Sequence, residues 1–269
     1  MLEGLKSESE EAIKWFETNN MFANPDKFQA IVVHPSNKNV NERYTLNVNN
    51  IEIKSTSSVN LLGIEIDNKL SFDNHVASLC KKAANQLNAL CRIHNHMGKK
   101  EKEVIINSFI YSNFNYCPLV WHFCSKRALN KIEKIQERCL RLVLNDYTSN
   151  YEELLQKSGN TTMEIRRLRT LAIEIFKTLN NINPSFMKDI FYQSPYASHK
   201  EHNLFVQRHN TVRFGQKSLK TLGPQIWNSL PENIRLETNL TNFKSSIKKW
   251  FGPKCACNLC SFQNQSCRT

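Results

Sequence analysis

The chain has 269 residues, of which 40% are apolar and 22% are charged, and its formal net charge at pH 7 is +12. This composition is typical of a folded chain with a sizeable core in one or two domains, and it excludes an intrinsically disordered protein. The seven glycines form neither a G-x-G-x-x-G nor a G-x-x-x-x-G-K-[ST] pattern, which excludes the commonest nucleotide-binding loops.

Positive charge is concentrated after residue 66. Residues 1–66 hold 6 Lys and Arg against 9 Asp and Glu, residues 67–145 hold 13 against 6, and residues 146–269 hold 17 against 9. A sustained excess of one sign raises the local concentration of polyanions. The distribution therefore favours a nucleic-acid partner, with solubility alone as the alternative.

Neither a secretion signal nor a membrane span is expected. The chain opens with the acidic stretch "LEGLKSESEE", and it contains no run of 18 apolar residues. Five cysteines lie among apolar residues: Cys80, Cys91, Cys117, Cys124 and Cys139. We interpret them as buried, reduced thiols, so the sequence predicts an intracellular protein, nuclear or cytoplasmic or both.

The first 66 residues predict one helix and about four strands. The helix is "SESEEAIKWFETNN", with Ser7 as its N-cap and Trp15 and Phe16 on a buried face. The stretch "KFQAIVVH" predicts a strand, and "YTLNVNNIEIK" predicts a hairpin that turns at Asn49 and Asn50. A further strand is expected at "VNLLGIEI".

The period of the apolar residues becomes helical after Ser71. One helical face is formed by Val76, Leu79, Ala83, Leu87 and Leu90. We expect Gly98 to stop this helix, and a second helix to run from near Lys100 into the aromatic segment that ends at Pro118. A third helix is predicted from Ser125 to Leu144. Three helices with short connections predict an antiparallel bundle.

The third predicted helix has one apolar face and one cationic face. Its inward positions are Leu129, Ile132, Ile135, Gln136, Cys139, Leu142 and Val143. Its other face carries Lys126, Arg127, Lys131, Lys134, Arg138 and Arg141, with only Glu133 and Glu137 as anions. Long cationic side chains on a rigid helix suit contacts with phosphates, which need no base readout. A merely solvated helix face is the alternative.

"NDYTSN", residues 145–150, reads as a boundary. Beyond it "MEIRRLRTLAIEIFKTLNN" predicts a helix with Arg166, Arg167 and Arg169 near its start, a second and smaller cationic cluster. Residues 193–209 are polar and predict a connector. "TLGPQIWNSLPENIR" reads as a turn-rich segment around Gly223-Pro224 and Pro231, and "LTNFKSSIKKW" as a short basic helix.

"LLGIEIDNKLSFDNH" brings two aspartates and a histidine close together in sequence, as a catalytic or metal centre would. Asp67 ends a predicted strand and precedes Asn68, which is the composition of a turn. Asp73 stands where the next helix needs an acceptor for its free N–H groups, and His75 follows on the first turn. We therefore interpret the stretch as a strand–turn–helix junction.

Four motifs, in order, resemble the reverse transcriptases of non-LTR retrotransposons, especially the jockey-like group. "AIKWFETNNMFANPDKFQAIVV" and "NLLGIEIDNKLSFDNHV" resemble the region that follows the active site and enters the thumb. "YCPLVWHFCSKRALNKIEKIQERCLRLVLN" is similar to a thumb segment, and "GPQIWNSLPENIRLETNLTNFKSSIKKW" to a C-terminal motif. The matching residues of the first two motifs are Trp15, Asn19, Asn24, Lys27, Leu62, Gly63, Leu70, Phe72 and His75.

The resemblance implies an RNA-directed DNA polymerase without its catalytic Asp-Asp region. In the family, those carboxylates hold Mg²⁺ and lie upstream of the position of Trp15, so we expect no cofactor and no primer extension from this chain alone. Lys27 matches a lysine that is thought to protonate the leaving pyrophosphate, which makes it a candidate auxiliary general acid. Its other interpretation is a solvated lysine at the start of a strand.

The last residues carry a cysteine cluster. Cys255, Cys257, Cys260 and Cys267 lie within thirteen residues, and one pair has the C-x-x-C spacing that chelates Zn²⁺. The other spacings are not those of known zinc sites. Zinc, another metal, disulfides and an unstructured tail all stay open for this segment.

Together these patterns predict an α+β protein. Its expected parts are a palm remnant with primer-grip-like strands (1–66), a helical thumb bundle (67–145), a mostly helical C-terminal domain (146–250) and a Cys-rich tail (251–269). The expected partners are an RNA template or RNA–DNA hybrid and an upstream polymerase core, with no membrane. The alternative functions are a catalytically dead nucleic-acid-binding module and a domesticated protein-interaction domain with an exposed apolar face on residues 5–66.

Overall fold

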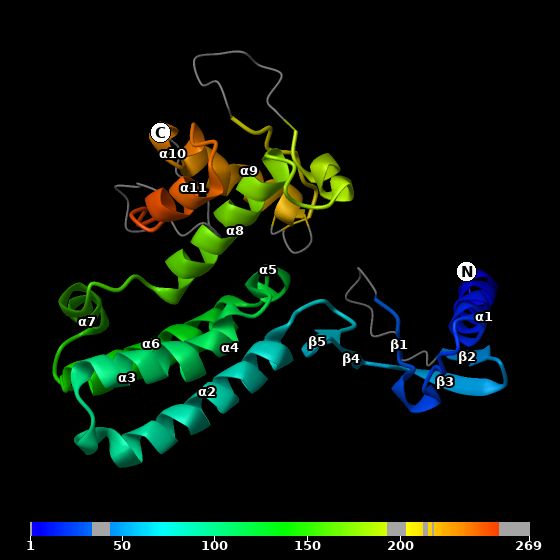
Figure 1. Ribbon diagram of the computed structural model, residues 1–269, viewed down its shortest axis with the longest axis horizontal. Helices are drawn as coiled ribbons and strands as arrows, with labels where there is room; N and C mark the ends of the chain where they lie inside the picture. The colour runs from blue at the N-terminus through cyan, green and yellow to red at the C-terminus, as the bar shows by residue number, and fades with distance from the viewer. Residues whose placement is uncertain (1, 34–43, 193–202, 212–214, 217, 253–269) are drawn as a thin grey trace. The chain divides into compact units, whose positions relative to one another are not determined.

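The computed structural model of the chain describes residues 2–33, 44–192, 203–211, 215–216 and 218–252. It divides the chain into two compact units, residues 1–76 and 77–269. Both units are shown in Figure 1. Helices dominate and the strands form two small sheets, so the α+β class is confirmed. The finer boundaries at residues 66, 145 and 250 stay predictions.

The larger sheet of the first unit is built around a hairpin. Strands β2 (Thr45–Val48) and β3 (Ile51–Thr56) are antiparallel, and the short strand β1 (Ala30–Ile31) pairs with β3 in parallel. The turn residues Asn49 and Asn50 have φ values of 46° and 64°. Asparagine tolerates this left-handed region, which two-residue hairpins of this type require, so the predicted turn is confirmed.

The strand expected over residues 59–66 is two strands. Strands β4 (Ser58–Leu61) and β5 (Ile64–Asp67) form a second antiparallel hairpin, which turns at Leu62 and Gly63 with φ values of 49° and 82°. The single-strand prediction was wrong because Gly63 supplies the positive φ that lets the chain reverse within an otherwise apolar run.

Helix α1 (Leu2–Thr18) is present, but two details of its prediction were wrong. The helix begins five residues before Ser7, so Ser7 lies inside it and is not its N-cap. No residue of α1 is buried, and Trp15 keeps 58% and Phe16 38% of its surface exposed. Nearby, the 3-10 turn η1 (Pro25–Lys27) is capped by Asn24, whose side chain accepts from the Asp26 amide at 2.9 Å.

The junction after β5 is organised by the Asp67 carboxylate. It accepts hydrogen bonds from the amides of Lys69, Ser71 and Phe72, the shortest being 2.7 Å from Phe72. Burial alone would raise the pKa of Asp67, but these donated bonds outweigh it and hold the pKa below 3.8. Helix α2 (Asp73–Ile93) then begins, so the strand–turn–helix interpretation of this stretch is confirmed.

His75 is buried on the first turn of α2, with 4% of its surface exposed. Its Nδ1 lies 3.4 Å from the Glu65 amide nitrogen, and its Nε2 has no partner among the described residues. Burial lowers the pKa of His75 below 6.5, against the opposing charge of Glu65. The ring is therefore part of the packing at this junction.

The second unit begins with the three-helix arrangement that the apolar period predicts (Figure 1). Helix α2 ends at Ile93 and a 3-10 turn η2 (His94–His96) follows, so Gly98 is the N-cap of α3 (Lys99–Ile105) and does not stop α2. The second helical stretch continues through a π-helical segment η3 (Ile106–Tyr111), α4 (Ser112–Asn115) and α5 (Pro118–Trp121). Helix α6 spans Lys126–Leu144.

Contacts between these helices fix their directions. Lys102 in the middle of α3, early in the second helical stretch, is buried, and its ammonium donates to the Leu142 carbonyl (3.4 Å) and to Asn145 Oδ1 (3.2 Å) at the end of α6. A cation at this helix end complements the partial negative charge of the terminal carbonyls. Helices α3 and α6 are therefore antiparallel, as expected. Asn113 of α4 donates to Gln86 of α2 at 2.7 Å.

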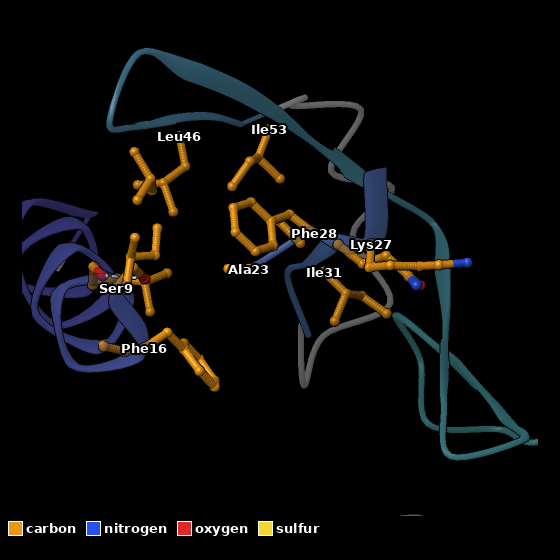
Figure 2. A pocket seen from close by; sticks show the side chains of 14 residues that line it. Ser9, Phe16, Ala23, Lys27, Phe28, Ile31, Leu46 and Ile53 are labelled. Atoms are coloured by element: carbon orange, nitrogen blue, oxygen red, sulfur yellow. Dashed lines mark hydrogen bonds between the residues drawn. The ribbon is translucent and has the colours of Figure 1, made fainter. Parts of the chain in front are cut away.

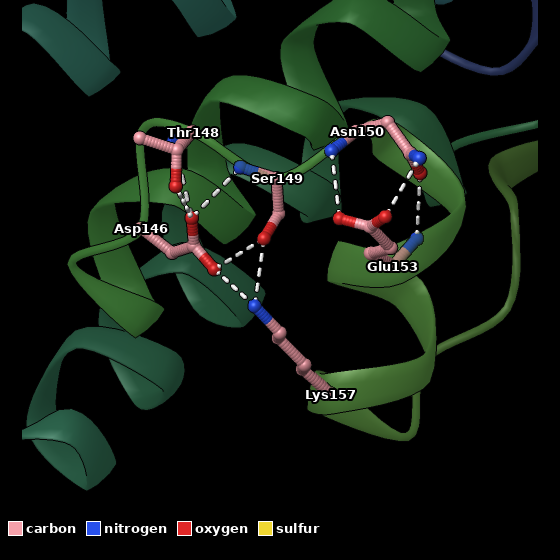
Figure 3. Close-up of polar contacts among 6 residues, drawn as sticks. All are labelled: Asp146, Thr148, Ser149, Asn150, Glu153 and Lys157. Atoms are coloured by element: carbon pink, nitrogen blue, oxygen red, sulfur yellow. Dashed lines mark hydrogen bonds and ion pairs between the residues drawn. The ribbon is translucent and has the colours of Figure 1, made fainter.

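The segment after α6 is held by a network of polar contacts (Figure 3). Asp146 accepts from the amides of Thr148 and Ser149, from the Ser149 hydroxyl and from the Lys157 ammonium at 2.6 Å. Asn150 then caps helix α7 (Tyr151–Ser158) in a capping box with Glu153. The expected boundary at residues 145–150 is thus an ordered turn that leads into a helix.

A second core lies under helix α8 (Met163–Leu179). It is completed by η4 (Ser185–Ile190), α9 (Leu219–Ser229), α10 (Glu232–Arg235) and α11 (Leu240–Ile247). At its centre Phe243 is fully buried and stacks on Phe176 with a centroid distance of 4.3 Å. The turn expected at Gly223-Pro224 is wrong because both residues lie inside α9, where Pro224 is buried. The predicted connector 193–209 is described only from residue 203.

Candidate nucleic-acid interface

Helix α6 supplies the face on which the sequence places its main cluster of cations. Ser125 caps the helix by accepting from the Ala128 amide at 3.2 Å, and every predicted inward residue is buried. Burial of that face turns the opposite face of the same helix outwards. The side chains of Lys126, Arg127, Lys131, Lys134 and Arg138 are exposed.

Four of these cations form one continuous stripe. Arg127, Lys131, Lys134 and Arg138 follow each other at spacings of four, three and four residues, which places them one above the other on a helix. The stripe extends over roughly 17 Å, since eleven residues separate its ends and each adds about 1.5 Å. A rigid line of cations is a suitable shape for one strand of a phosphate backbone.

The carboxylates of α6 do not neutralise this stripe. Glu133 points to the other side, where it accepts from Tyr151 (2.6 Å) and from the amides of Met163 (3.1 Å) and Glu164 (2.8 Å). Glu137 pairs with Arg141 at 2.7 Å. Over the described ranges, the ion pairs of the structure leave out every cation of the stripe. Their full charge is therefore available to an anionic partner.

Helix α2 runs beside the stripe and in the same direction. Arg138 Nη2 donates to Asn88 Oδ1 of α2 at 2.9 Å. Burial raises the pKa of the Cys80 thiol to about 11, and the charge of Lys131 opposes that rise, so Lys131 lies on the side of α6 towards the first half of α2. The Cys80–Lys131 interaction and the Asn88–Arg138 hydrogen bond advance together along both helices, so α2 and α6 are parallel neighbours.

Two cations of α2 extend the face, and the sequence reading missed them. Lys81 and Arg92 are exposed and lie seven residues before and four residues after Asn88, on the side of α2 that contacts α6. The sequence places Lys81, Asn88 and Arg92 on one face of a helix, but only the contact between Asn88 and Arg138 shows that this face lies beside the stripe. We call the six exposed cations the basic face: Lys81, Arg92, Arg127, Lys131, Lys134 and Arg138.

Other predicted cations have their guanidinium groups occupied within the protein. Arg141 is paired with Glu137, and Arg166 donates to Asn160 at 2.8 Å and lies over the Tyr111 ring. Arg169 donates twice to the Trp250 carbonyl, at 2.9 and 2.6 Å. These contacts tie helices together. We do not include these three arginines in the basic face, and phosphate contact by them stays a prediction.

Arg167 is buried, with 3% of its surface exposed, and its guanidinium lies over the Trp121 ring at 5.7 Å. Burial lowers its pKa from 12.5, and the charges of Glu133 and Glu164 oppose that shift. A phosphate on the surface cannot reach this group, so its prediction as a binding residue was wrong. The sequence alone did not show which of Arg166, Arg167 and Arg169 points into the protein.

The structure assigns no catalytic role to Lys27 and no metal-binding role to the cysteines of the tail. Lys27 ends η1 and is exposed. The described residues contain no group of three or more His, Cys, Asp or Glu side chains placed to hold a metal ion. Cys255, Cys257, Cys260 and Cys267 lie outside the described residues. Of the five other cysteines, Cys80, Cys124 and Cys139 are buried as expected, whereas Cys91 and Cys117 are exposed.

Comparison with known proteins adds little to this geometry. No protein-family model matches the chain, and no solved structure matches it. The chain is 26% identical over 218 residues to Protein BZZ1 of Saccharomyces cerevisiae, an alignment that covers 79% of this chain and 30% of that protein. The chain thus spans about a third of the length of the curated relative it matches. In the described residues, none of the helices is long and apolar enough to cross a membrane.

Proposed function

We propose that this chain is the thumb-side part of a non-LTR retrotransposon reverse transcriptase and that it binds a template–primer duplex. The observation that carries the proposal is the basic face, where six exposed cations on two parallel helices have no carboxylate partner among the described residues. The four motifs of the sequence supply the family. The expected ligand is an RNA–DNA hybrid or another nucleic-acid duplex.

Binding through this face should not depend on base sequence. Its side chains are long cations on helix surfaces, which suit phosphate oxygens, and phosphate contacts carry no sequence information. Each phosphate that a cation neutralises releases counterions, so the affinity should fall steeply as salt concentration rises. The proposal assigns template–primer binding to residues 77–144 and assigns no catalytic step to them.

The test is a charge-neutralised variant in which Arg127, Lys131, Lys134 and Arg138 are all replaced by Gln. Four lost phosphate contacts should reduce the slope of log K against log salt by roughly 3 to 4 on duplex, at about 0.9 per contact. Arg141 is not in this set because it is paired with Glu137. The fold should be retained, since none of the four side chains is buried.

A matched control carries the same change in net charge elsewhere. Lys82, Lys220, Lys244 and Lys249 are exposed and lie off the stripe, and we expect their replacement by Gln to change the slope far less. If both quadruple variants lose the same slope, only the overall charge matters. If the stripe variant keeps the parental slope with a native circular dichroism spectrum, the proposed interface is wrong.

A further inference from the structure

The first unit contains an apolar groove that its described side chains leave open. Helix α1 turns Leu5, Ala12, Ile13 and Phe16 towards the sheet, yet a space of about 510 Å³ remains between the helix and the strands. Figure 2 shows Phe16 on one side of this space and Phe28, Leu46 and Ile53 on the other. Protein interiors are close-packed, so a space of this size is not a finished core.

The polar atoms that line the groove are already occupied or point away. Ser9 Oγ donates to the Leu5 carbonyl at 2.7 Å, and Gln29 Oε1 accepts from the Asn60 amide at 2.9 Å. The Lys27 ammonium lies away from the apolar side chains in Figure 2. Most of the described side chains that line the groove are apolar, so it suits apolar side chains better than a small polar ligand.

The exposed apolar surface continues beyond the groove. Trp15 is 58% exposed, Met21 is 41% exposed, and Phe22 next to it is 93% exposed. Exposed large apolar side chains beside an apolar groove are typical of a protein interaction site.

Charge decides between a second copy of the chain and a different partner. Helix α1 carries five glutamates against two lysines, and one of those lysines, Lys6, is paired with Glu10. Two copies of α1 would bring like charges together, which disfavours self-association. The acidic flanks instead complement a partner with basic residues beside its apolar face.

We propose that the groove between α1 and the β1-β3-β2 sheet binds an amphipathic helix of another protein, with large apolar side chains on one face and Lys or Arg along its edges. Such helices place anchors at i, i+3, i+4 and i+7 in an apolar groove. This site is separate from the basic face and does not depend on the proposed nucleic-acid function.

The test uses three labelled model peptides with the full chain: an amphipathic Leu/Lys helix, a Leu/Glu helix of the same apolar pattern, and a scrambled Leu/Lys sequence. Fluorescence anisotropy measures affinity, and the emission of Trp15, whose ring contacts that of the groove residue Phe16, reports on binding at α1. Trp15 is the exposed tryptophan, whereas Trp121, Trp227 and Trp250 are buried. We expect the Leu/Lys helix to bind most tightly and to shift the emission to the blue.

Two neutral substitutions locate the binding. Ala12→Gln places a longer polar side chain into the groove from an exposed position, and Ser7→Gln makes the matched change on the outer face of α1. We expect the first to weaken binding of the Leu/Lys helix by about tenfold or more, the effect of about 1.4 kcal/mol, and the second to leave it unchanged. The Leu/Glu helix should bind, if at all, at basic surfaces and show no response to Ala12→Gln.

Three results would overturn the proposal. The first is a Leu/Lys affinity that equals that of the scrambled peptide. The second is an affinity that Ala12→Gln leaves unchanged. The third is a dimer whose formation depends on protein concentration and is abolished by Ala12→Gln, because the occupant would then be a second copy of this chain.

Discussion

Replacing Glu133 with Ala should destabilise the second unit more than any other single change to the charged surface of α6. The Glu133 carboxylate joins three helices, because it accepts from Tyr151 of α7 and from the amides of Met163 and Glu164 at the start of α8. Its charge also offsets that of the buried Arg167. The substitution removes all of these contacts at once.

The loss of unfolding free energy can be worked out from the three hydrogen-bond donors that lose their acceptor, the Tyr151 hydroxyl and the amides of Met163 and Glu164. Hydrogen bonds to a charged group contribute about 1.5–3 kcal/mol each, and a buried donor without a partner costs about 1–3 kcal/mol. The three donors are only partly buried, so water recovers some of this loss. We expect the free energy of unfolding to fall by roughly 3–5 kcal/mol, a large part of the 5–15 kcal/mol that is usual for a protein.

Urea unfolding followed by circular dichroism measures this loss, provided that the m-value is unchanged. Glu137→Ala is the control, because it removes the same charge one turn further along α6 and breaks only the pair with Arg141. That variant should lose about 1 kcal/mol or less. Equal losses in the two variants would refute the reasoning that Glu133 organises the start of α8.

Two further predictions concern acid and the second core. The first unit should lose stability as the pH falls below about 6.5, because burial lowers the pKa of His75 and the unfolded chain therefore binds the proton more readily. It should lose stability again below about 3.8, because the pKa of Asp67 is lower in the folded protein than in the unfolded chain. The urea concentration at the unfolding midpoint, measured at several pH values, tests both effects. If a His75→Gln variant shows the same change of midpoint with pH above pH 5 as the parent chain, the assignment to His75 is wrong. Phe243→Ala should cost about 3–5 kcal/mol by leaving a cavity beside Phe176, and a loss below about 1 kcal/mol would mean that the core repacks.

Elements with a local signal were predictable from the sequence. Helix α6 follows from the Ser125 cap and an uninterrupted apolar period, and the β2–β3 hairpin follows from Asn49 and Asn50 at its turn. In each case the residues that decide the structure lie within a few positions of one another. For the same reason, all four cations of the α6 stripe could be placed on the outer face of the helix from the sequence.

Predictions from the sequence were wrong or incomplete where contacts between residues far apart in the chain determine the structure. Pro224 reads as a helix breaker, yet it lies inside α9 and is buried against the second core. Arg166, Arg167 and Arg169 look alike as a cluster, but contacts with Tyr111, Trp121 and Trp250 give each a different environment. Those partners lie 45 or more residues away, beyond the reach of any local pattern.

Nucleic-acid contact at the basic face is tested most directly by lysine footprinting. The full chain is pulsed with an acetylating reagent, with and without a saturating RNA–DNA hybrid, and the modification of each lysine is measured by mass spectrometry. Lys81 and Lys82 provide an internal comparison, because they are adjacent and both exposed, and only Lys81 lies on the side of α2 that contacts α6. We expect the hybrid to slow the acetylation of Lys81, Lys131 and Lys134 and to leave Lys82 unchanged. Equal protection of Lys81 and Lys82, or no protection of Lys131 and Lys134 by a bound hybrid, would contradict the proposed interface.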